Sequence, residues 1–260
     1  MHFNTIQYAE SQSIATITLN RPDKRNAMNG ELIEDLLKAL EMAAHSGARV
    51  LILTGAGKAF CAGMDLENLK LLTGRTHEQT VQDSQTAARM FRTLYDFPKP
   101  TIAAVNGAAI AGGTGLATIC DFTLAVPEAK FGYTEVRIGF VPAIVSSFLI
   151  AAIGEKRSRD LLLTGRIFGT QEAHELGLVN EIVAPDELMK RTLELAGQLA
   201  ENSPASLRAT KGLLSSYTRE QLDRQVAQAV HENAAIRQTA DFKEGVSSFL
   251  EKRKPVWKDQ

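Results

Sequence analysis

The sequence predicts an α/β fold in which strand–turn–helix units are repeated and stacked. Short apolar runs alternate with helical patterns through the first half of the chain, and after Pro142 almost every segment has helical spacing. In addition, residues 53–56 and 105–108 lie 52 positions apart and look like two copies of one unit. A repeat of this length favours stacked supersecondary units over a single open sheet.

The composition is that of an ordinary globular protein. The 260 residues are 44% hydrophobic and 23% charged, which is enough to bury one substantial core. The formal net charge is −1 and no basic arm is present. Nucleic acid is therefore not expected as a partner, because such binding depends on neutralising phosphates.

Cysteine usage and the N-terminal segment indicate where the protein works. Cys61 and Cys120 are the only cysteines, too few for a disulfide framework, so a reducing compartment is expected. The N-terminus has no charged region followed by an apolar stretch, and no apolar run is long enough to cross a bilayer. We therefore expect a cytoplasmic protein that does not associate with membranes.

The first elements follow from hydrophobic spacing and capping residues. Residues 14–19 alternate as a half-buried strand does, and a polar break follows at 21–26. Asn29 is a suitable N-cap for a helix with an apolar stripe, which Gly47 ends. Residues 50–53 then form a short, fully apolar strand.

The middle and the end of the chain alternate less regularly. Residues 67–85 are polar and weakly patterned, which predicts a mobile loop or a marginal helix, and helical spacing returns at 87–95. Ser203 followed by Pro204 resembles a helix start, and it predicts a boundary between a core at 1–202 and a helical region at 203–260. The other predicted strands are 101–105, 122–126 and 178–183, and the other predicted helices are 113–120, 158–164, 171–176 and 185–200.

Two glycine-rich turns and one glutamate are the candidate functional residues. The turns at 60–66 and 106–115 each follow an apolar run and precede a helical segment. Small residues let backbone N–H groups approach a ligand, and a helix start leaves such donors unpaired. Two converging donors can bind an oxyanion, and Glu135 can supply proton transfer.

These motifs, in their order and spacing, resemble the crotonase superfamily, also called the enoyl-CoA hydratase/isomerase superfamily. The resemblance covers nearly the whole chain. It implies a spiral of ββα units followed by a C-terminal helical region that builds trimers, commonly stacked as hexamers. The segments that carry the resemblance are 20–22, 26–27, 60–66, 104–121, 131–142 and 252–255.

The resemblance also implies a site for an acyl-CoA thioester. The main-chain N–H groups of Met64 and Gly112 match the family's oxyanion donors, and Glu135 matches the second of its two catalytic glutamates. Coenzyme A is part of the substrate, and no metal or other cofactor is expected. The residues implied to bind the substrate are Lys24, Arg25, Ala27, Ala62, Gly63, Met64, Asp65, Leu66 and Gly112.

One position departs from the family pattern. The first family glutamate falls at Gly115, which has no side chain. Hydratases with two carboxylates use the pair to hold water, whereas Glu135 alone is sufficient to move a proton from C2 to C4. The expected function is therefore 2-enoyl-CoA hydration or double-bond isomerisation in lipid metabolism, with hydration requiring another group to hold the water.

Other interpretations of the function and of single residues remain open. A decarboxylase or C–C lyase acting on a branched acyl-CoA fits the same site, and RNA binding occurs in the superfamily although the charge argues against it. Asp65 is a better helix cap than catalyst, and Cys61 lacks a histidine partner and is expected to be a packed residue. Lys24 and Arg25 fit a solvated turn nearly as well as a phosphate contact.

Overall fold

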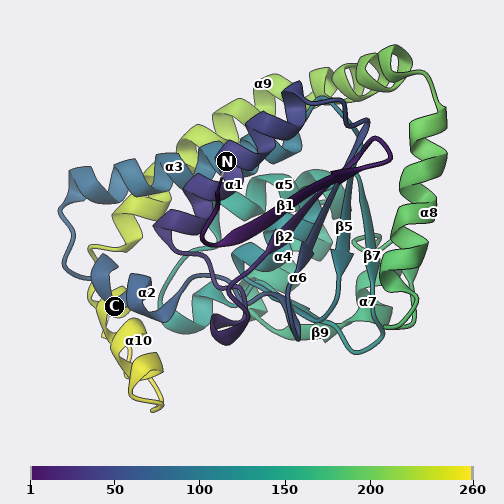
Figure 1. Ribbon diagram of the computed structural model, residues 1–260. Coiled ribbons are helices and arrows are strands. Elements are labelled where there is room, and N and C mark those ends of the chain that lie inside the picture. Colours follow the sequence, from purple (N-terminus) through teal and green to yellow (C-terminus); the bar gives the residue numbers. More distant parts are fainter. Residues whose placement is uncertain (1, 259–260) are drawn as a thin grey trace.

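The protein consists of two β-sheets surrounded by helices, as the computed structural model of residues 2–258 shows (Figure 1). The side chain of Leu66 lies outside the described part. The strands are β1 (Ile6–Ser11), β2 (Ile14–Leu19), β3 (Val50–Gly55), β4 (Ala59–Cys61), β5 (Thr101–Val105), β6 (Ala108–Ile110), β7 (Phe122–Ala125), β8 (Lys130–Gly132), β9 (Ile167–Gly169) and β10 (Glu181–Ile182). The helices are α1 (Gly30–His45), α2 (Leu66–Leu72), α3 (His77–Tyr95), α4 (Gly112–Ile119), α5 (Ala143–Ile153), α6 (Glu155–Thr164), α7 (Thr170–Glu175), α8 (Leu188–Glu201), α9 (Pro204–Ile236) and α10 (Ala240–Leu250), with short 3-10 turns η1 (Pro22–Lys24) and η2 (Glu135–Ile138).

The sheet topology is that of a repeating spiral. A six-stranded sheet has the order β1-β2-β3-β5-β7-β10, and a four-stranded sheet has the order β4-β6-β8-β9. In the pairs β3/β4, β5/β6 and β7/β8, the first strand lies in the large sheet and the second in the small one. The strands paired across these repeats run parallel. The repeat expected from the sequence is therefore confirmed as stacked units of two strands and a helix.

Glycines at equivalent places in two units let the chain turn from one sheet to the other. A Cβ on Gly55 would lie 2.4 Å from the Ala59 carbonyl oxygen, and a Cβ on Gly107 would lie 2.2 Å from that of Lys58. Backbone crowds both positions, so only glycine fits there. These two glycines belong to the segments whose 52-residue spacing revealed the repeat.

Of the two structures expected for residues 67–85, a mobile loop or a marginal helix, the helix is present, because α2 and the start of α3 cover this region except for residues 73–76. Helix α3 starts with a capping box in which Thr76 and Gln79 exchange side-chain and backbone hydrogen bonds. Its buried face uses small polar residues: the Thr80 hydroxyl donates to His77 O, and the Ser84 hydroxyl donates to Thr80 O. Small polar residues of this kind can satisfy their hydroxyl groups on the helix backbone, so the first half of α3 carries no hydrophobic stripe that the sequence could reveal.

The remaining elements lie close to their predicted positions. Asn29 caps α1 by accepting from the Leu32 N–H at 2.9 Å, and Ser203 caps α9. The strand expected at 178–183 is shorter and covers only β10. Across residues 2–258, no helix combines the length and apolar character needed to span a bilayer.

The C-terminal helices reach back over the earlier part of the chain. Helix α9 packs along α3 and α5, and α10 then turns down against η2 and α2 (Figure 1). Thr239 starts α10 by accepting from the Phe242 N–H at 3.1 Å. These contacts bring α10 beside the turn that precedes α2, where the first candidate residues lie.

Candidate active site

Three neighbouring strands of the small sheet each end next to a candidate residue. Strand β4 leads to Met64, β6 leads to Gly112 and β8 leads to Glu135. Because β4, β6 and β8 are parallel neighbours, their carboxyl ends meet at one edge of the sheet. That edge is where open α/β folds commonly bind ligands. The topology therefore brings the three candidates to one place.

The two glycine-rich turns touch at this edge. Gly63 has a φ of +86°, and a Cβ there would lie 2.9 Å from Ile110 O and 3.1 Å from the Ala111 Cβ. Only glycine combines this backbone conformation with such a close approach. The residues that immediately precede Met64 and Gly112 are therefore in van der Waals contact.

Residues 25–28 pair with the first turn and fix the direction of its N–H groups. The Met28 N–H donates to Gly63 O at 2.7 Å, and the Asp65 N–H donates to Met28 O at 2.9 Å. Successive residues of an extended chain direct their backbone groups to opposite sides. The Met64 N–H therefore points away from residues 25–28. Ala62 extends this pairing by donating to Arg25 O at 3.0 Å.

Ala111 holds the second turn in an unusual conformation. Its φ of 52° and ψ of −122° are strained for a residue with a Cβ, and such strain is concentrated at functional sites. The Ala111 N–H donates to Gly132 O at 2.6 Å. A Cβ on Gly113 would lie 2.1 Å from Cys61 O, which shows how closely α4 starts against β4. Gly112 is the first residue of α4, so its N–H has no partner within the helix.

Glu135 is a buried carboxyl group with an unpaired oxygen. It starts η2, and the Phe140 N–H holds its main-chain carbonyl at 3.0 Å. The residue is only 8% exposed to solvent. Within residues 2–258, its Oε2 has no hydrogen-bond partner. Burial raises the pKa of Glu135 to about 7, because the charged form is poorly solvated. A group with this pKa can both accept and donate a proton at neutral pH.

Apolar side chains occupy the space beside Gly112 and Gly115, two of the three glycines of α4. A Cβ on Gly115 would lie 2.5 Å from Val145 Cγ1 and 3.0 Å from Phe91 Cε1. A Cβ on Gly112 would lie 2.4 Å from the methyl group of Met28. The surroundings of Gly115 are therefore hydrophobic, and a larger side chain there would have to displace Val145.

Asp65 has the capping role that the sequence predicted. Its Oδ1 accepts the Glu67 N–H at 2.9 Å at the start of α2, and its Oδ2 lies 2.8 Å from Arg21 Nη1. Burial raises the pKa of the Asp65 carboxyl, but the Glu67 N–H and the Arg21 guanidinium outweigh this effect and lower it. Asp65 is therefore a charged structural group that fixes the first turn.

The residues expected to face coenzyme A lie around the same turn. Lys24 is exposed and lies 3.1 Å from a carboxylate oxygen of Glu67, and Arg25 adopts a left-handed conformation with a φ of 51°. Ala27 is buried, whereas Ala62 and Met64 are partly exposed. Leu66 begins α2, but its side chain lies outside the described part. That these residues contact coenzyme A remains a prediction from the family resemblance.

Cys61 is packed in the core. It is fully buried beside the start of α4, and burial raises the pKa of its thiol to about 12. A thiol with this pKa is not a nucleophile at neutral pH. The structure therefore agrees with the packed role expected from the sequence.

Sequence reasoning missed two groups near this region. Phe140 and Arg237 lie beside the Glu135 segment, with the Arg237 guanidinium carbon 5.4 Å from the centre of the Phe140 ring. Arg237 lies 102 positions after Glu135 in the sequence, at the end of a polar helix, and nothing in its local sequence pattern indicates that it is buried. Only the fold of α9 over the core reveals it.

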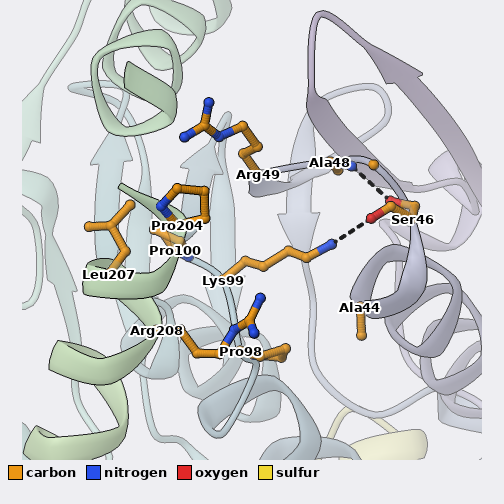
Figure 2. Close-up of a pocket in the computed structure, with 11 residues that line it drawn as sticks. Ala44, Ser46, Ala48, Arg49, Pro98, Lys99, Pro100, Pro204, Leu207 and Arg208 are labelled. Carbon is orange, nitrogen blue, oxygen red and sulfur yellow. Dashed lines mark hydrogen bonds between the residues drawn. The ribbon is translucent and has the colours of Figure 1, made fainter. Parts of the chain in front are cut away.

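Two surface pockets lie away from the candidate active site. One of about 250 Å³ is formed by the end of α1, residues 98–100 and the start of α9, with Lys99 directed toward the Ser46 carbonyl at 3.0 Å (Figure 2). The other, of about 760 Å³, lies between α2 and α10 and includes Lys70 and Lys243. Neither includes any of the residues expected to form the site.

Comparison with known proteins decides the family. The family model described as enoyl-CoA hydratase/isomerase matches residues 9–260. This chain belongs to the enoyl-CoA hydratase/isomerase family. A Thermus thermophilus protein named "Putative enoyl-CoA hydratase" is 46% identical, with 95% of this chain and 98% of that protein covered. The 2,3-dehydroadipyl-CoA hydratase of Escherichia coli is 34% identical, with 96% and 97% covered.

Solved structures of the family have the same fold. An enoyl-CoA hydratase/isomerase from Pseudoalteromonas atlantica superimposes with a TM-score of 0.88 at 31% identity, covering 98% of this chain and 100% of that one. One from Xanthobacter autotrophicus gives a TM-score of 0.90 at 28% identity, covering 96% and 94%. The fold class expected from the sequence is therefore confirmed, and membership of the family makes the chain an enzyme acting on acyl-CoA.

Proposed function

We propose that this protein hydrates trans-2-enoyl-CoA thioesters through an enolate, with Glu135 as its acid/base group. The observation that carries the proposal is the buried, unpaired Glu135 carboxyl at the strand edge where the Met64 and Gly112 turns also end. Several relatives are named as hydratases, including a crotonyl-CoA hydratase of Syntrophomonas wolfei that is 32% identical over 98% of both chains.

In the proposed mechanism, the main-chain N–H groups of Met64 and Gly112 bind the thioester oxygen. Polarisation of the carbonyl stabilises negative charge on that oxygen when water adds to C3. A single donor of this kind is typically worth about 3–4 kcal/mol in the transition state. Glu135 takes a proton from the attacking water, and the acid formed then gives a proton to C2, so the reaction adds one water molecule overall.

Substrate contacts complete the proposal. The pantetheine would follow residues 62–66, and Lys24, Arg25 and Ala27 would lie toward the nucleotide. Cationic side chains favour phosphate groups, although the Lys24–Glu67 pair must open before Lys24 can contact one. We propose that coenzyme A enters only as part of the substrate and that no other cofactor is needed.

Double-bond isomerisation is the second candidate, and the surroundings of Gly115 favour it. If Gly115 occupies the place of the first family glutamate, Val145 and Phe91 fill the space in which that carboxylate would hold water. Glu135 alone can remove a proton from C2 of a 3-enoyl-CoA and return it to C4. This route needs no bound water.

Product analysis separates the two candidates. Purified protein is incubated with a trans-2-enoyl-CoA and, separately, with a trans-3-enoyl-CoA, and the products are identified by chromatography and mass. A product heavier by one water from the first substrate supports hydration, and conversion of the second to the 2-enoyl isomer without change of mass supports isomerisation. A Glu135→Gln variant should abolish either reaction, and absence of turnover with both substrates would defeat the proposal.

We further propose that residues 203–260 serve oligomerisation, as a trimer or a dimer of trimers. Supporting this, the outer face of α9 exposes Leu213, Leu214 and Tyr217. Such an apolar face is costly in water and suits a subunit contact. Light scattering of the purified protein tests this proposal, and a monomer at micromolar concentration would contradict it.

A further inference from the structure

Arg237 places a guanidinium group in the interior of the protein. The residue follows the last turn of α9 and is only 4% exposed. Its Nη2 donates to Asn233 Oδ1 at 2.6 Å, and the same oxygen lies 2.8 Å from the Ser84 hydroxyl, whose one proton is shared between it and Thr80 O. Among the residues that the structure describes, its Nε and Nη1 have no hydrogen-bond partner. Arg237 is therefore held in orientation by Asn233 while two of its nitrogen atoms stay unsatisfied.

The charge of this guanidinium is only partly balanced. Nη1 lies 3.6 Å from Asp83 Oδ2, which is too long for a hydrogen bond, and the other Asp83 oxygen binds Arg75. Two guanidinium groups therefore share one carboxylate, which leaves one positive charge in excess. Burial lowers the pKa of Arg237 to about 10, although Asp83 acts in the opposite direction. A buried cation without full compensation is costly, and a second anion would relieve that cost.

Arg237 adjoins an apolar cluster that also includes residues next to the candidate active site. Its guanidinium carbon lies 5.4 Å from the centre of the Phe140 ring, and the Phe140 N–H binds Glu135 O. Met64 packs against the same apolar cluster as Phe140. The other members of this cluster are Leu69, Leu72, Ile138, Ile236, Phe242 and Val246. Apolar side chains therefore lie between the turn that holds Met64 and the Arg237 guanidinium.

We propose that Arg237 binds a carboxylate at the far end of the acyl chain, so that the preferred substrates are enoyl-CoA thioesters of dicarboxylic acids. The inference rests on the proposed function, because it assumes that the acyl chain starts at Met64, Gly112 and Glu135. The methylene groups of such a chain would contact the apolar cluster, and its terminal carboxylate would supply the missing acceptors. A chain that ends in a methyl group would leave Nε and Nη1 unsatisfied.

A purely structural role is the alternative. In that case Arg237 would serve only to join α9 to α3 through Asp83, and its loss would weaken folding without changing substrate preference. The two roles differ in one measurable respect. Both Arg237→Met and Asp83→Asn break the pair between the helices, but only Arg237→Met removes the proposed carboxylate ligand.

The experiment compares two six-carbon trans-2-enoyl-CoA substrates, one ending in a methyl group and the other in a carboxylate. Wild-type protein should show the higher kcat/KM for the carboxylate substrate. Arg237→Met should lower that value by about ten- to a hundredfold, as expected for loss of a hydrogen-bonded charge, and leave the methyl substrate unaffected or improved. Asp83→Asn, the matched control, should retain the preference. Thermal melting verifies that both variants are folded.

Two results would overturn the inference. One is a wild-type enzyme that turns over the methyl substrate with no preference for the carboxylate. The other is an equal loss on both substrates in Arg237→Met and Asp83→Asn. If neither substrate is turned over, the proposed function fails, and calorimetric binding of the two saturated six-carbon CoA thioesters decides the inference separately. Tighter binding of the carboxylate compound that is lost in Arg237→Met supports it, and equal affinity overturns it.

Discussion

Gly63 and Ala111 touch across the edge of the small sheet, although they lie 48 positions apart in the sequence. A Cβ on Gly63 would lie 3.1 Å from the Ala111 Cβ, and both residues have positive φ angles. Each immediately precedes a proposed N–H donor, Met64 in one turn and Gly112 in the other. The close approach of the two turns is therefore what brings the proposed donors to a common site.

The proposed role of Gly112 depends on its N–H and not on its side chain. Gly112→Pro removes this N–H at the first position of a helix, where it makes no hydrogen bond within the helix. Steady-state kinetics should show a loss of about 10²–10³ in kcat, as expected when one oxyanion donor is removed. Gly112→Ala is the control: it keeps the donor, and its Cβ would lie 2.4 Å from the flexible end of Met28 and 3.6 Å from Phe91 Cζ, an ordinary contact. Similar activity of the two folded variants would disprove a donor role for Gly112.

The raised pKa of Glu135 predicts a pH-dependent cost in stability. The folded pKa of about 7 lies above the ordinary value of 4.5 for a glutamate, so the group costs nothing well below pH 4.5, where it is protonated in both states. Between about pH 4.5 and 7 the unfolded state releases this proton while the folded state keeps it, so the folded state loses about 3 kcal/mol relative to the unfolded state, and above pH 7 the loss is complete. Glu135→Gln should therefore raise the melting temperature at pH 8.5 and change it little at pH 4.5. Glu128→Gln, at an exposed site, should have no such pH-dependent effect.

The contact between Gly115 and Val145 predicts a non-additive pair of substitutions. Gly115→Ala would place a methyl group 2.5 Å from Val145 Cγ1, and overpacking of this kind costs about 1–3 kcal/mol. Val145→Ala removes the obstructing methyl groups. Denaturant unfolding should show that the double variant is more stable than the sum of the single effects predicts. Simple additivity would show that the two residues are not in direct contact.

The two cysteines should be inert in the native state. Burial raises the pKa of both Cys61 and Cys120 to about 12, and both side chains are inaccessible. Iodoacetamide at pH 7.5 should therefore leave the mass and the activity unchanged until denaturant is added. Rapid alkylation of Cys61 in the folded protein would contradict the packing described for the first turn.

Much of the fold was predictable because its signals are local. Asn29 and Ser203 mark helix starts by their chemistry, and the glycines at 55 and 107 revealed the repeat because backbone contact requires glycine there. Only the second half of helix α3 was clearly predictable, since the buried face of its first half uses Thr80 and Ser84 in place of large apolar residues. Arg237 was also missed, because its burial depends on α9 packing over distant segments.

The candidate site was only partly predictable for the same reason. Met64, Gly112 and Glu135 stood out through the turns and motifs around them. The apolar side chains beside them did not, since Phe91 and Val145 come from α3 and α5 and reach Gly115 only in the folded chain. Neither residue belongs to a motif that indicates a site.

The pH dependence of kcat/KM for a trans-2-enoyl-CoA, compared between wild-type protein and Glu135→Gln, tests the central claim most directly. Glu135 must be deprotonated to act as a base, so wild-type activity should rise with pH through an ionisation near 7. Glu135→Gln should lose this ionisation together with about 10²–10⁴ of the activity. A Glu135→Gln variant with wild-type rates and an unchanged pH profile would contradict the account.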